Sequence, residues 1–205
     1  MKISTKDKII NAAIKCFAKN GIEQTKLIDI AETAKIKHNL ILYHFQNFEQ
    51  LCRAAVEQVV HSFFKETQKI SLEKQKNAKE HLLEFITGHF QLAQIHPAAF
   101  SLWLHFYYKA SNDDHYKQLF KTISVSSTEK LKSILMQYGH FMKLNHTEIQ
   151  LEFFAKSIIG QIIGQLTLSL AEENPNYHLN IQYCFHLAVE LLDNKSNSLN
   201  NIMNS

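Results

Sequence analysis

The sequence predicts an all-α protein, and three observations lead to that fold class. Of its 205 residues only five are glycine and two are proline, which leaves few of the tight turns that hairpins need. Apolar residues recur at helical spacing, and no alternation of apolar and polar residues is long enough for a sheet. Hydrophobic residues make up 45 % of the chain, enough to bury a substantial core without metals or disulfides.

The N-terminal part has the spacing of a helix-turn-helix. Ser4 or Thr5 can cap a helix over residues 6–20, which Gly21 can end. Thr25 is a favoured N-cap for a short second helix, and a third follows after a three-residue break. The apolar stripes of these two short helices are Leu27, Ile30, Ala31, Ala34, Leu40, Ile41 and Phe45.

The rest of the chain is expected to form longer helices. They are predicted over residues 48–69, 75–95, 97–111, 114–141, 146–173 and 177–193. Pro97 suits a first helical turn, and Asn145 or Thr147 can begin a helix. We therefore divide the chain into a helix-turn-helix domain, a helical bundle domain and a polar tail, at residues 1–50, 51–193 and 194–205.

Positive charge is concentrated in the first fifth of the chain. The formal net charge is +3, and residues 1–45 hold eight lysines against four acids, which leaves residues 46–205 slightly acidic. A local basic excess is expected where a protein binds phosphates, although a solvated lysine-rich surface explains the charge as well.

Neither export nor membrane insertion is indicated. The first eight residues contain no apolar run typical of a signal peptide, and polar residues interrupt the most apolar stretch, 158–170. Cys16, Cys52 and Cys184 are odd in number and far apart, which favours reduced core thiols over a disulfide framework. We therefore expect a cytoplasmic protein that does not contact a membrane.

A set of regularly spaced residues between positions 8 and 53 consists of Ile10, Ala13, Phe17, Gly21, Thr25, Ile30, Ala31, Ala34, Ile36, Tyr43, His44, Phe45 and Asn47. This pattern resembles the N-terminal domain of the TetR family of bacterial transcriptional regulators. The resemblance implies a homodimeric repressor whose third helix enters the major groove of double-stranded DNA at a pseudo-palindromic operator. The mini-core holding that helix would be Phe17, Ile30, Ile36, Ile41 and Phe45.

The resemblance also implies which side chains face DNA. The expected DNA-binding residues are Thr25, Lys26, Lys37, His38, Asn39, Leu42, Tyr43 and His44. Residues 37–39 would form the tip that reaches base edges, where Asn39 could bind adenine, and Leu42 could meet a thymine methyl group. Thr25, Lys26, Tyr43 and His44 could hold phosphates. Because Arg53 is the single arginine beside 21 lysines, we predict an A·T-rich half-site.

Three positions depart from the family's usual residues. Lys35 replaces the turn glycine, Lys37 a serine cap and Phe48 a basic residue. The first must accept a left-handed conformation or be accommodated by a different turn. Lys2, Lys6 and Lys8 could supply some of the missing phosphate contacts. These departures leave an alternative open, a helical ligand-binding module of the same fold with weak or lost DNA binding.

A looser similarity covers residues 95–190. The stretch 99–110 and the leucines at 119, 131 and 135 resemble the effector domains of the choline-responsive, BetI-like branch of the family. This implies a small organic effector bound between helices. Candidate pocket residues are Phe85, His89, Trp103, Phe106, Tyr107 and Tyr138, although an aromatic-rich core explains each of them too. Glu84 is the only acid near them, so an uncharged or fatty ligand fits as well as a cation.

Gly160 and Gly164 lie four residues apart on one predicted helix. A helical glycine costs about 1 kcal/mol relative to alanine, so the pair indicates a close helix crossing, either inside the subunit or between subunits. In the family, the last two long helices form the dimer interface. The predicted interface residues are Ile159, Gly160, Ile163, Gly164, Phe185 and Leu192.

No enzymatic chemistry is expected. Cys184 and His186 are two residues apart on a predicted helix, where side chains diverge, and neither a nucleophile motif nor a Gly-rich phosphate loop is present. We therefore predict no catalytic residues, no metal and no cofactor. The predicted function is a ligand-responsive, DNA-binding transcriptional regulator.

Overall fold

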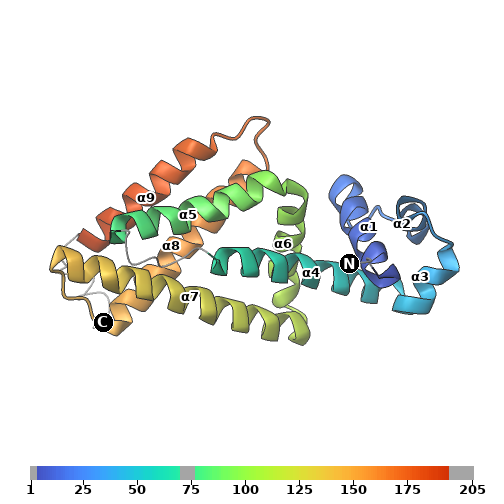
Figure 1. Cartoon of the computed structure of the whole chain (residues 1–205), viewed down its shortest axis with the longest axis horizontal. Coiled ribbons are helices and arrows are strands. Elements are labelled where there is room, and N and C mark those ends of the chain that lie inside the picture. Colours follow the sequence, from blue (N-terminus) through green and yellow to red (C-terminus); the bar gives the residue numbers. More distant parts are fainter. Residues whose placement is uncertain (1–3, 70–76, 194–205) are drawn as a thin grey trace. The chain divides into compact units, whose positions relative to one another are not determined.

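The computed structural model describes residues 4–69 and 77–193, and every regular element in these ranges is an α-helix (Figure 1). The helices are α1 (Thr5–Asn20), α2 (Leu27–Ala34), α3 (His38–Phe45), α4 (Phe48–Gln68), α5 (Ala78–Ile95), α6 (Pro97–Ala110), α7 (Asp114–Met142), α8 (Glu148–Ser169) and α9 (Tyr177–Asp193). The predicted all-α class is confirmed for the described chain. The tail predicted at 194–205 lies outside the described residues.

Local capping chemistry sets several helix ends. The Ser4 hydroxyl accepts a hydrogen bond from the Asp7 backbone N–H at 3.1 Å and begins α1. Thr147 and Gln150 exchange two hydrogen bonds, of 3.2 and 2.8 Å, where α8 begins. Gly21 ends α1 with a φ of 78°, a conformation that favours glycine. These ends lie at or within a few residues of the predicted ones.

The helices group into two compact units. The first extends to Thr67 and includes Leu92–Thr122, and the second comprises Gln68–Gln91 and the residues from Ile123 onward. Helices α5 and α7 contribute to both units. The boundary predicted at residue 50 therefore falls inside the first unit.

The first unit contains the three short N-terminal helices, α4 and α6. Helix α1 packs against both α2 and α6. The fully buried apolar side chains of the first unit include Ile9, Ala13, Ile30, Ile41, Leu51, Ala55, Val56 and Phe106. An aromatic cluster from α4, α6 and α7 adds Phe63, Phe100, Trp103, Phe106, Tyr107, Tyr116 and Phe120. The N-terminal helices thus share a continuous core with the helices that follow them.

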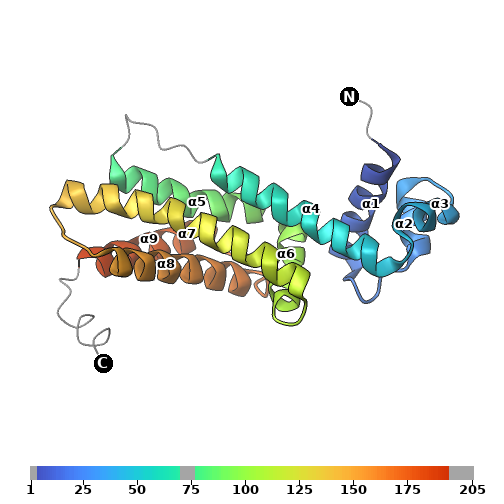
Figure 2. The same ribbon diagram turned by 90° about the horizontal axis from the view of Figure 1, so that it is seen from below.

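In the second unit, α8 and α9 lie side by side, because residues 170–176 turn the chain back (Figure 2). The fully buried Tyr138 of α7 donates a hydrogen bond to the Asp193 carboxylate of α9 at 3.2 Å. Lys132 is nearly buried and pairs with Glu129 at 3.0 Å and with Glu148 at 3.3 Å. These polar contacts tie α7 to both C-terminal helices.

All three cysteines are buried free thiols. Burial raises the pKa of Cys52 and of Cys184 to about 11. The predicted reduced core thiols are therefore present. In the described part of the chain, no helix has both the length and the apolar character needed to cross a membrane.

Candidate nucleic-acid interface

Helix α3 is held from behind by a small core. Phe17 of α1, Ile30 and Ala31 of α2, and Ile41 and Phe45 of α3 are all buried. These are the crossing contacts expected of a helix-turn-helix, in which a short helix is supported by the one before it. One face of α3 is therefore fixed by packing, and the opposite face is open.

The turn between α2 and α3 accommodates lysine in place of glycine. Lys35 adopts the left-handed conformation, with φ 55° and ψ 49°. Its backbone N–H donates to the Glu32 carbonyl at 3.1 Å, and the N–H of Ile36 donates to the Ala31 carbonyl at 3.0 Å. These are the two bonds of a Schellman motif, so the helix ends in the same way that a glycine would end it. The strain falls on Lys35, because a side chain at positive φ is unfavourable.

The open face of α3 carries most of the residues predicted to contact DNA. Tyr43 is 80 % exposed and Leu42 is 39 % exposed, and Lys37 and Asn39 are also exposed. His38 and His44 are half-buried, and the Tyr43 and His44 rings meet edge to face at 5.3 Å. Lys26, just before α2, is exposed as well. The structure thus brings donors, cations and apolar groups to one side of the short helices.

Thr25 differs from its predicted role. It is only 5 % exposed, and its hydroxyl donates to the Gly21 carbonyl at 2.7 Å. The N-cap of α2 is Lys26, not Thr25, and the Asp29 carboxylate accepts a hydrogen bond from the Lys26 backbone N–H at 2.8 Å. The predicted cap is therefore wrong, because the Thr25 hydroxyl is already used inside the α1–α2 loop.

Leu40, which is predicted to belong to the apolar stripe, is a further residue on the outer face. It lies on α3 with 36 % of its surface exposed, while Ile41 and Phe45 are buried. Helical spacing could have found it, because residues 41 and 45 share a face and residue 40 is turned by about 100° from residue 41.

Phe48 and Lys6 show how the interface is supported. The half-buried Phe48 ring packs edge to face on the buried Phe17, with centroids 5.7 Å apart, so it extends the core at a position where a basic residue is usual. The Asn47 side chain accepts a hydrogen bond from the Gln50 backbone N–H at 2.8 Å and begins α4. The Lys6 ammonium lies 5.7 Å from the centre of the Phe45 ring, next to α3. Lys2 lies outside the described residues.

Ionic contacts fix the position of α4 within the first unit. Arg53 pairs with Asp113 at 3.0 Å and lies over the Tyr116 ring, and His115 contacts Glu57. Burial raises the pKa of Tyr116 well above its usual value. The helix that directly follows α3 is thus tied to the start of α7.

The six predicted effector-binding residues fall into two sets. Trp103, Phe106 and Tyr107 belong to the first unit, where the Trp103 ring lies 5.8 and 5.9 Å from the other two. Burial raises the pKa of Tyr107, and a hydrogen bond with Trp103 partly offsets this.

The other three residues belong to the second unit. The His89 and Phe85 rings are tilted by 51° with centroids 4.7 Å apart, and the His89 Nδ1 lies 2.7 Å from the Phe85 carbonyl oxygen. Burial lowers the pKa of His89 and, with the Asp193 contact, raises the pKa of Tyr138 to about 12. The three aromatic rings of the first unit pack against one another, and His89 packs against Phe85 in the second, as core residues do.

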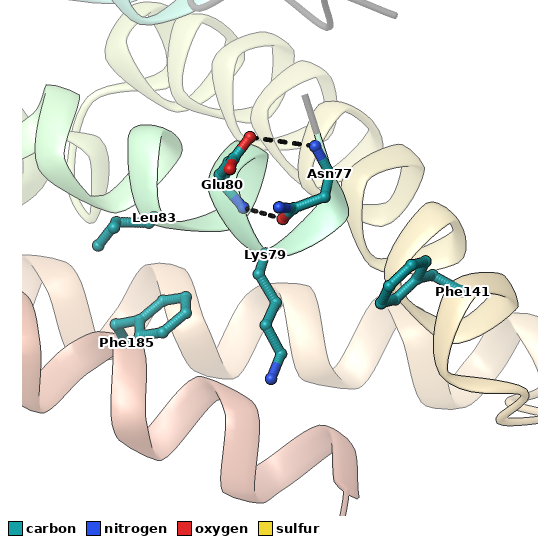
Figure 3. Close-up of a pocket in the computed structure, with 6 residues that line it drawn as sticks. All are labelled: Asn77, Lys79, Glu80, Leu83, Phe141 and Phe185. Carbon is teal, nitrogen blue, oxygen red and sulfur yellow. Dashed lines mark hydrogen bonds between the residues drawn. The ribbon is translucent and has the colours of Figure 1, made fainter. Parts of the chain in front are cut away.

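Two hollows are lined by other residues. One, of about 300 Å³ in the second unit, is lined by Asn77, Lys79, Glu80, Leu83, Phe141 and Phe185 (Figure 3). Its Asn77 and Glu80 exchange hydrogen bonds of 3.1 and 2.9 Å that begin α5, so these polar groups serve the helix end (Figure 3). The other, of about 520 Å³, lies in the first unit.

The residues predicted for a dimer interface differ in exposure. Gly160 and Gly164 are exposed, and a Cβ built on either would meet no atom within 4 Å. They therefore do not serve a helix crossing within the described part of the second unit. Ile159, Ile163 and Phe185 are half-buried, whereas Leu192 is fully buried in its own subunit and has no surface to offer a partner.

Comparison with known proteins finds similarity in the N-terminal region. Residues 9–55 match the model of the "Bacterial regulatory proteins, tetR family". The negative transcriptional regulator IcaR of the biofilm operon icaADBC, from Staphylococcus epidermidis, is 40 % identical over 58 residues, 28 % of this chain and 31 % of that protein. The HTH-type transcriptional regulator TtgR of Pseudomonas putida is 40 % identical over 53 residues, 26 % of this chain and 25 % of that protein. The alignments therefore span less than a third of each relative.

The likeness in fold extends much further along the chain. A TetR-like transcriptional regulator from Rhodococcus sp. RHA1 has a TM-score of 0.73 at 14 % sequence identity, over 95 % of this chain and 99 % of that one. Residues 9–55 are therefore similar to the N-terminal domain of the tetR family of bacterial regulatory proteins, and the described chain shares its all-helical fold with a TetR-like transcriptional regulator.

Proposed function

We propose that this protein is a homodimeric, cytoplasmic transcriptional regulator that binds a pseudo-palindromic operator and responds to a small organic ligand. The observation that carries the proposal is the open face of α3, where Lys37, Asn39, Leu42 and Tyr43 are exposed while Ile41 and Phe45 anchor the helix. A short helix that is fixed on one side and carries both polar and apolar side chains on the other suits insertion into a major groove.

Each exposed group has a chemical counterpart on DNA. The Asn39 amide can donate and accept at the edge of an adenine, and Leu42 can contact a thymine methyl group. Lys26, Lys37 and Tyr43 can bind phosphates, which fix the helix in register without reading sequence. Thr25 is not part of this proposal, because its hydroxyl bonds to Gly21. With no arginine on α3, an A·T-rich half-site fits best.

Dimerisation is proposed to use the exposed faces of α8 and α9. Gly160 and Gly164 leave a shallow strip on α8 that a helix of a second subunit can approach closely. Exposed apolar side chains on the two helices are Ile149, Phe153, Leu168, Leu179 and Tyr183. A two-fold dimer would place two α3 helices in successive major grooves, about 34–36 Å apart.

The effector is proposed to bind among the helices that follow the DNA-binding domain. The ligand-bound dimer would favour a distance between its two α3 helices that does not match successive major grooves. Release of DNA by the ligand would make the protein a repressor. The similarity of residues 95–190 to BetI-like effector domains stays a prediction.

The alternative, a helical module that has lost DNA binding, rested on Lys35, Lys37 and Phe48. Lys35 completes a Schellman motif, and Phe48 packs on Phe17, so two of these three residues fit a working helix-turn-helix. These contacts favour DNA binding.

The test is a gel shift on DNA from upstream of the protein's own gene, at two salt concentrations. Binding is expected to weaken steeply with salt, since each neutralised phosphate contributes about 0.9 to the log–log slope. Lys37→Ala should reduce that slope, and Asn39→Ala should weaken binding by about 1–3 kcal/mol. Lys121→Ala and Asn112→Ala, at exposed positions of the same unit, are the matched controls and should leave DNA binding unchanged. No shift of the unaltered protein at low salt would refute the proposal.

A further inference from the structure

The hollow of the second unit brings a lysine together with two phenylalanine rings from different helices. In Figure 3 the Lys79 side chain extends from α5 into the space between Phe185 of α9 and Phe141 of α7. Leu83, one turn further along α5, adds to the apolar wall. At about 300 Å³ the hollow lies at the lower end of the size range of small-molecule sites, about 300–1,000 Å³.

The aromatic rings of this hollow are not used by a packed core. Phe141 is 63 % exposed, Leu83 is 39 % exposed and Phe185 is half-buried. Within the described residues neither phenylalanine ring contacts another aromatic ring, unlike the clustered rings of the first unit. A ligand with an apolar body would remove this surface from water and could stack on the rings.

Lys79 differs from other lysines of the second unit in having no carboxylate partner. Lys132 and Lys156 both pair with glutamates. Lys79 is exposed and makes no ion pair in the part of the chain that the structure describes. Its ammonium therefore keeps its hydrogen-bond donors for a ligand.

Glu80 is the one carboxylate among the described lining residues, and it serves the helix end. It accepts a hydrogen bond from the Asn77 backbone N–H at 3.1 Å where α5 begins, and the positive end of the helix dipole there offsets part of its charge. In Figure 3 Glu80 turns toward Asn77, and Lys79 extends the opposite way. The charge between the two rings is therefore positive.

We propose that this hollow binds an organic carboxylate with an apolar body, the carboxylate at the Lys79 ammonium and the body against the Phe141 and Phe185 rings. A carboxylate accepts strong, charge-assisted hydrogen bonds from an ammonium, whereas an organic cation would be repelled by it. None of the six aromatic and histidine residues predicted from the sequence to bind the effector lines this hollow. The proposal makes no claim about DNA and does not rest on the proposed function.

Binding is measured by isothermal titration calorimetry on the full chain, with 2-naphthoate as the probe. The control ligand is 2-naphthamide, which has the same rings and a neutral head. We expect saturable binding of 2-naphthoate, about five-fold tighter than that of the amide, as for an ion pair open to water, and a smaller preference at high salt. Equal affinities would overturn the role of the charge, and no saturable binding of 2-naphthoate would overturn the site.

Opposite charge changes at two neighbouring positions locate the head group. Lys79→Gln should remove the preference for 2-naphthoate over the amide. Glu80→Gln keeps an oxygen that can accept from the Asn77 N–H but removes the negative charge, so it should tighten the binding of 2-naphthoate. Lys143→Gln, exposed in the same unit and outside the lining, is the control and should leave the preference unchanged.

Three results would overturn the assignment of the head group to Lys79. The first is a preference for 2-naphthoate that survives Lys79→Gln. The second is an equal loss of the preference in Lys143→Gln, which would indicate a general attraction of anions. The third is weaker binding of 2-naphthoate by Glu80→Gln.

The contact with the apolar body is tested with Phe141→Ala. This variant should weaken 2-naphthoate and 2-naphthamide alike, by at least about three-fold, because both ligands carry the same rings. Met136→Ala, 59 % exposed on the same helix and outside the lining, is the control and should leave both affinities unchanged. Thermal unfolding establishes that each variant is folded. Unchanged affinities in folded Phe141→Ala would overturn the contact between this ring and the ligand.

Discussion

Helices α3 and α8 both expose apolar side chains, yet the neighbours of those side chains differ. On α3, Leu42 and Tyr43 stand among lysine, asparagine and histidine residues. On α8, Leu168 is 61 % exposed and continues a strip that contains Gly160 and Gly164. A mixed polar and apolar face fits the edges of bases and their hydration, whereas an apolar strip of small residues fits another helix. Exposed hydrophobic side chains alone therefore do not indicate the kind of partner. The residues that surround them on the same helix face do.

The largest expected effect concerns the α8 strip. Gly160→Leu should abolish the dimer and lower operator affinity by more than about 100-fold, because each half-site would then be bound independently. The subunit should stay folded, since no atom lies within 4 Å of the added Cβ. Size-exclusion chromatography with light scattering and a gel shift measure the two effects. Gln137→Leu, on the exposed surface of α7, is the control, and a dimeric Gly160→Leu protein would contradict the assignment of this face.

The two sides of α3 can be separated by adjacent substitutions. Ile41→Ala removes a fully buried side chain and should lower the free energy of unfolding by about 2–5 kcal/mol. Leu42→Ala should change it by less than about 0.5 kcal/mol and weaken operator binding instead. Urea denaturation and gel shift give the two quantities. A Leu42→Ala protein with unchanged DNA affinity would show that the outer side of α3 does not read bases.

The turn before α3 offers a smaller effect in the opposite direction. Lys35→Gly should stabilise the protein by about 0.5–1 kcal/mol, because relief of the left-handed strain exceeds the entropy that glycine adds to the unfolded chain. Lys35→Ala is the control and should give no gain, since alanine keeps the Cβ. The free energy of unfolding of both variants is measured by urea denaturation. Equal changes in the two variants would show that the left-handed backbone of Lys35 is not strained.

The smallest expected effect is a pH dependence in the second unit. Burial lowers the pKa of His89 in the folded chain below its usual value of about 6.5, so the unfolded chain binds the proton more readily. The folded state therefore loses stability as the pH falls from the pKa of His89 in the unfolded chain toward its lower pKa in the folded chain. His89→Gln should reduce the loss of thermal stability between pH 7.5 and 5.5, and the exposed His178→Gln should not. Identical pH profiles for all three proteins would contradict this.

Much of the helix-turn-helix could be predicted because its signals are local. Gly21, the three-residue break before α3 and the spacing of Ile30, Ile41 and Phe45 lie within a few helical turns, and the structure contains each of them where expected. The left-handed Lys35 was one of the two outcomes that the sequence left open. Thr25 could not be placed in this way, because its hydroxyl bonds to a carbonyl that only the folded α1–α2 loop brings near.

The sequence by itself determined the all-α class, most helix boundaries to within a few residues and the residues available to α3, since helical period and capping act over a few neighbouring residues. Tertiary structure decided which of those residues are reachable. Leu40, predicted in an apolar stripe, is exposed, and Leu192, predicted at a dimer interface, is buried. The six aromatic and histidine residues predicted to bind the effector divide between two units. The physical reason is that burial depends on which helix covers a given face, and that partner is distant in sequence.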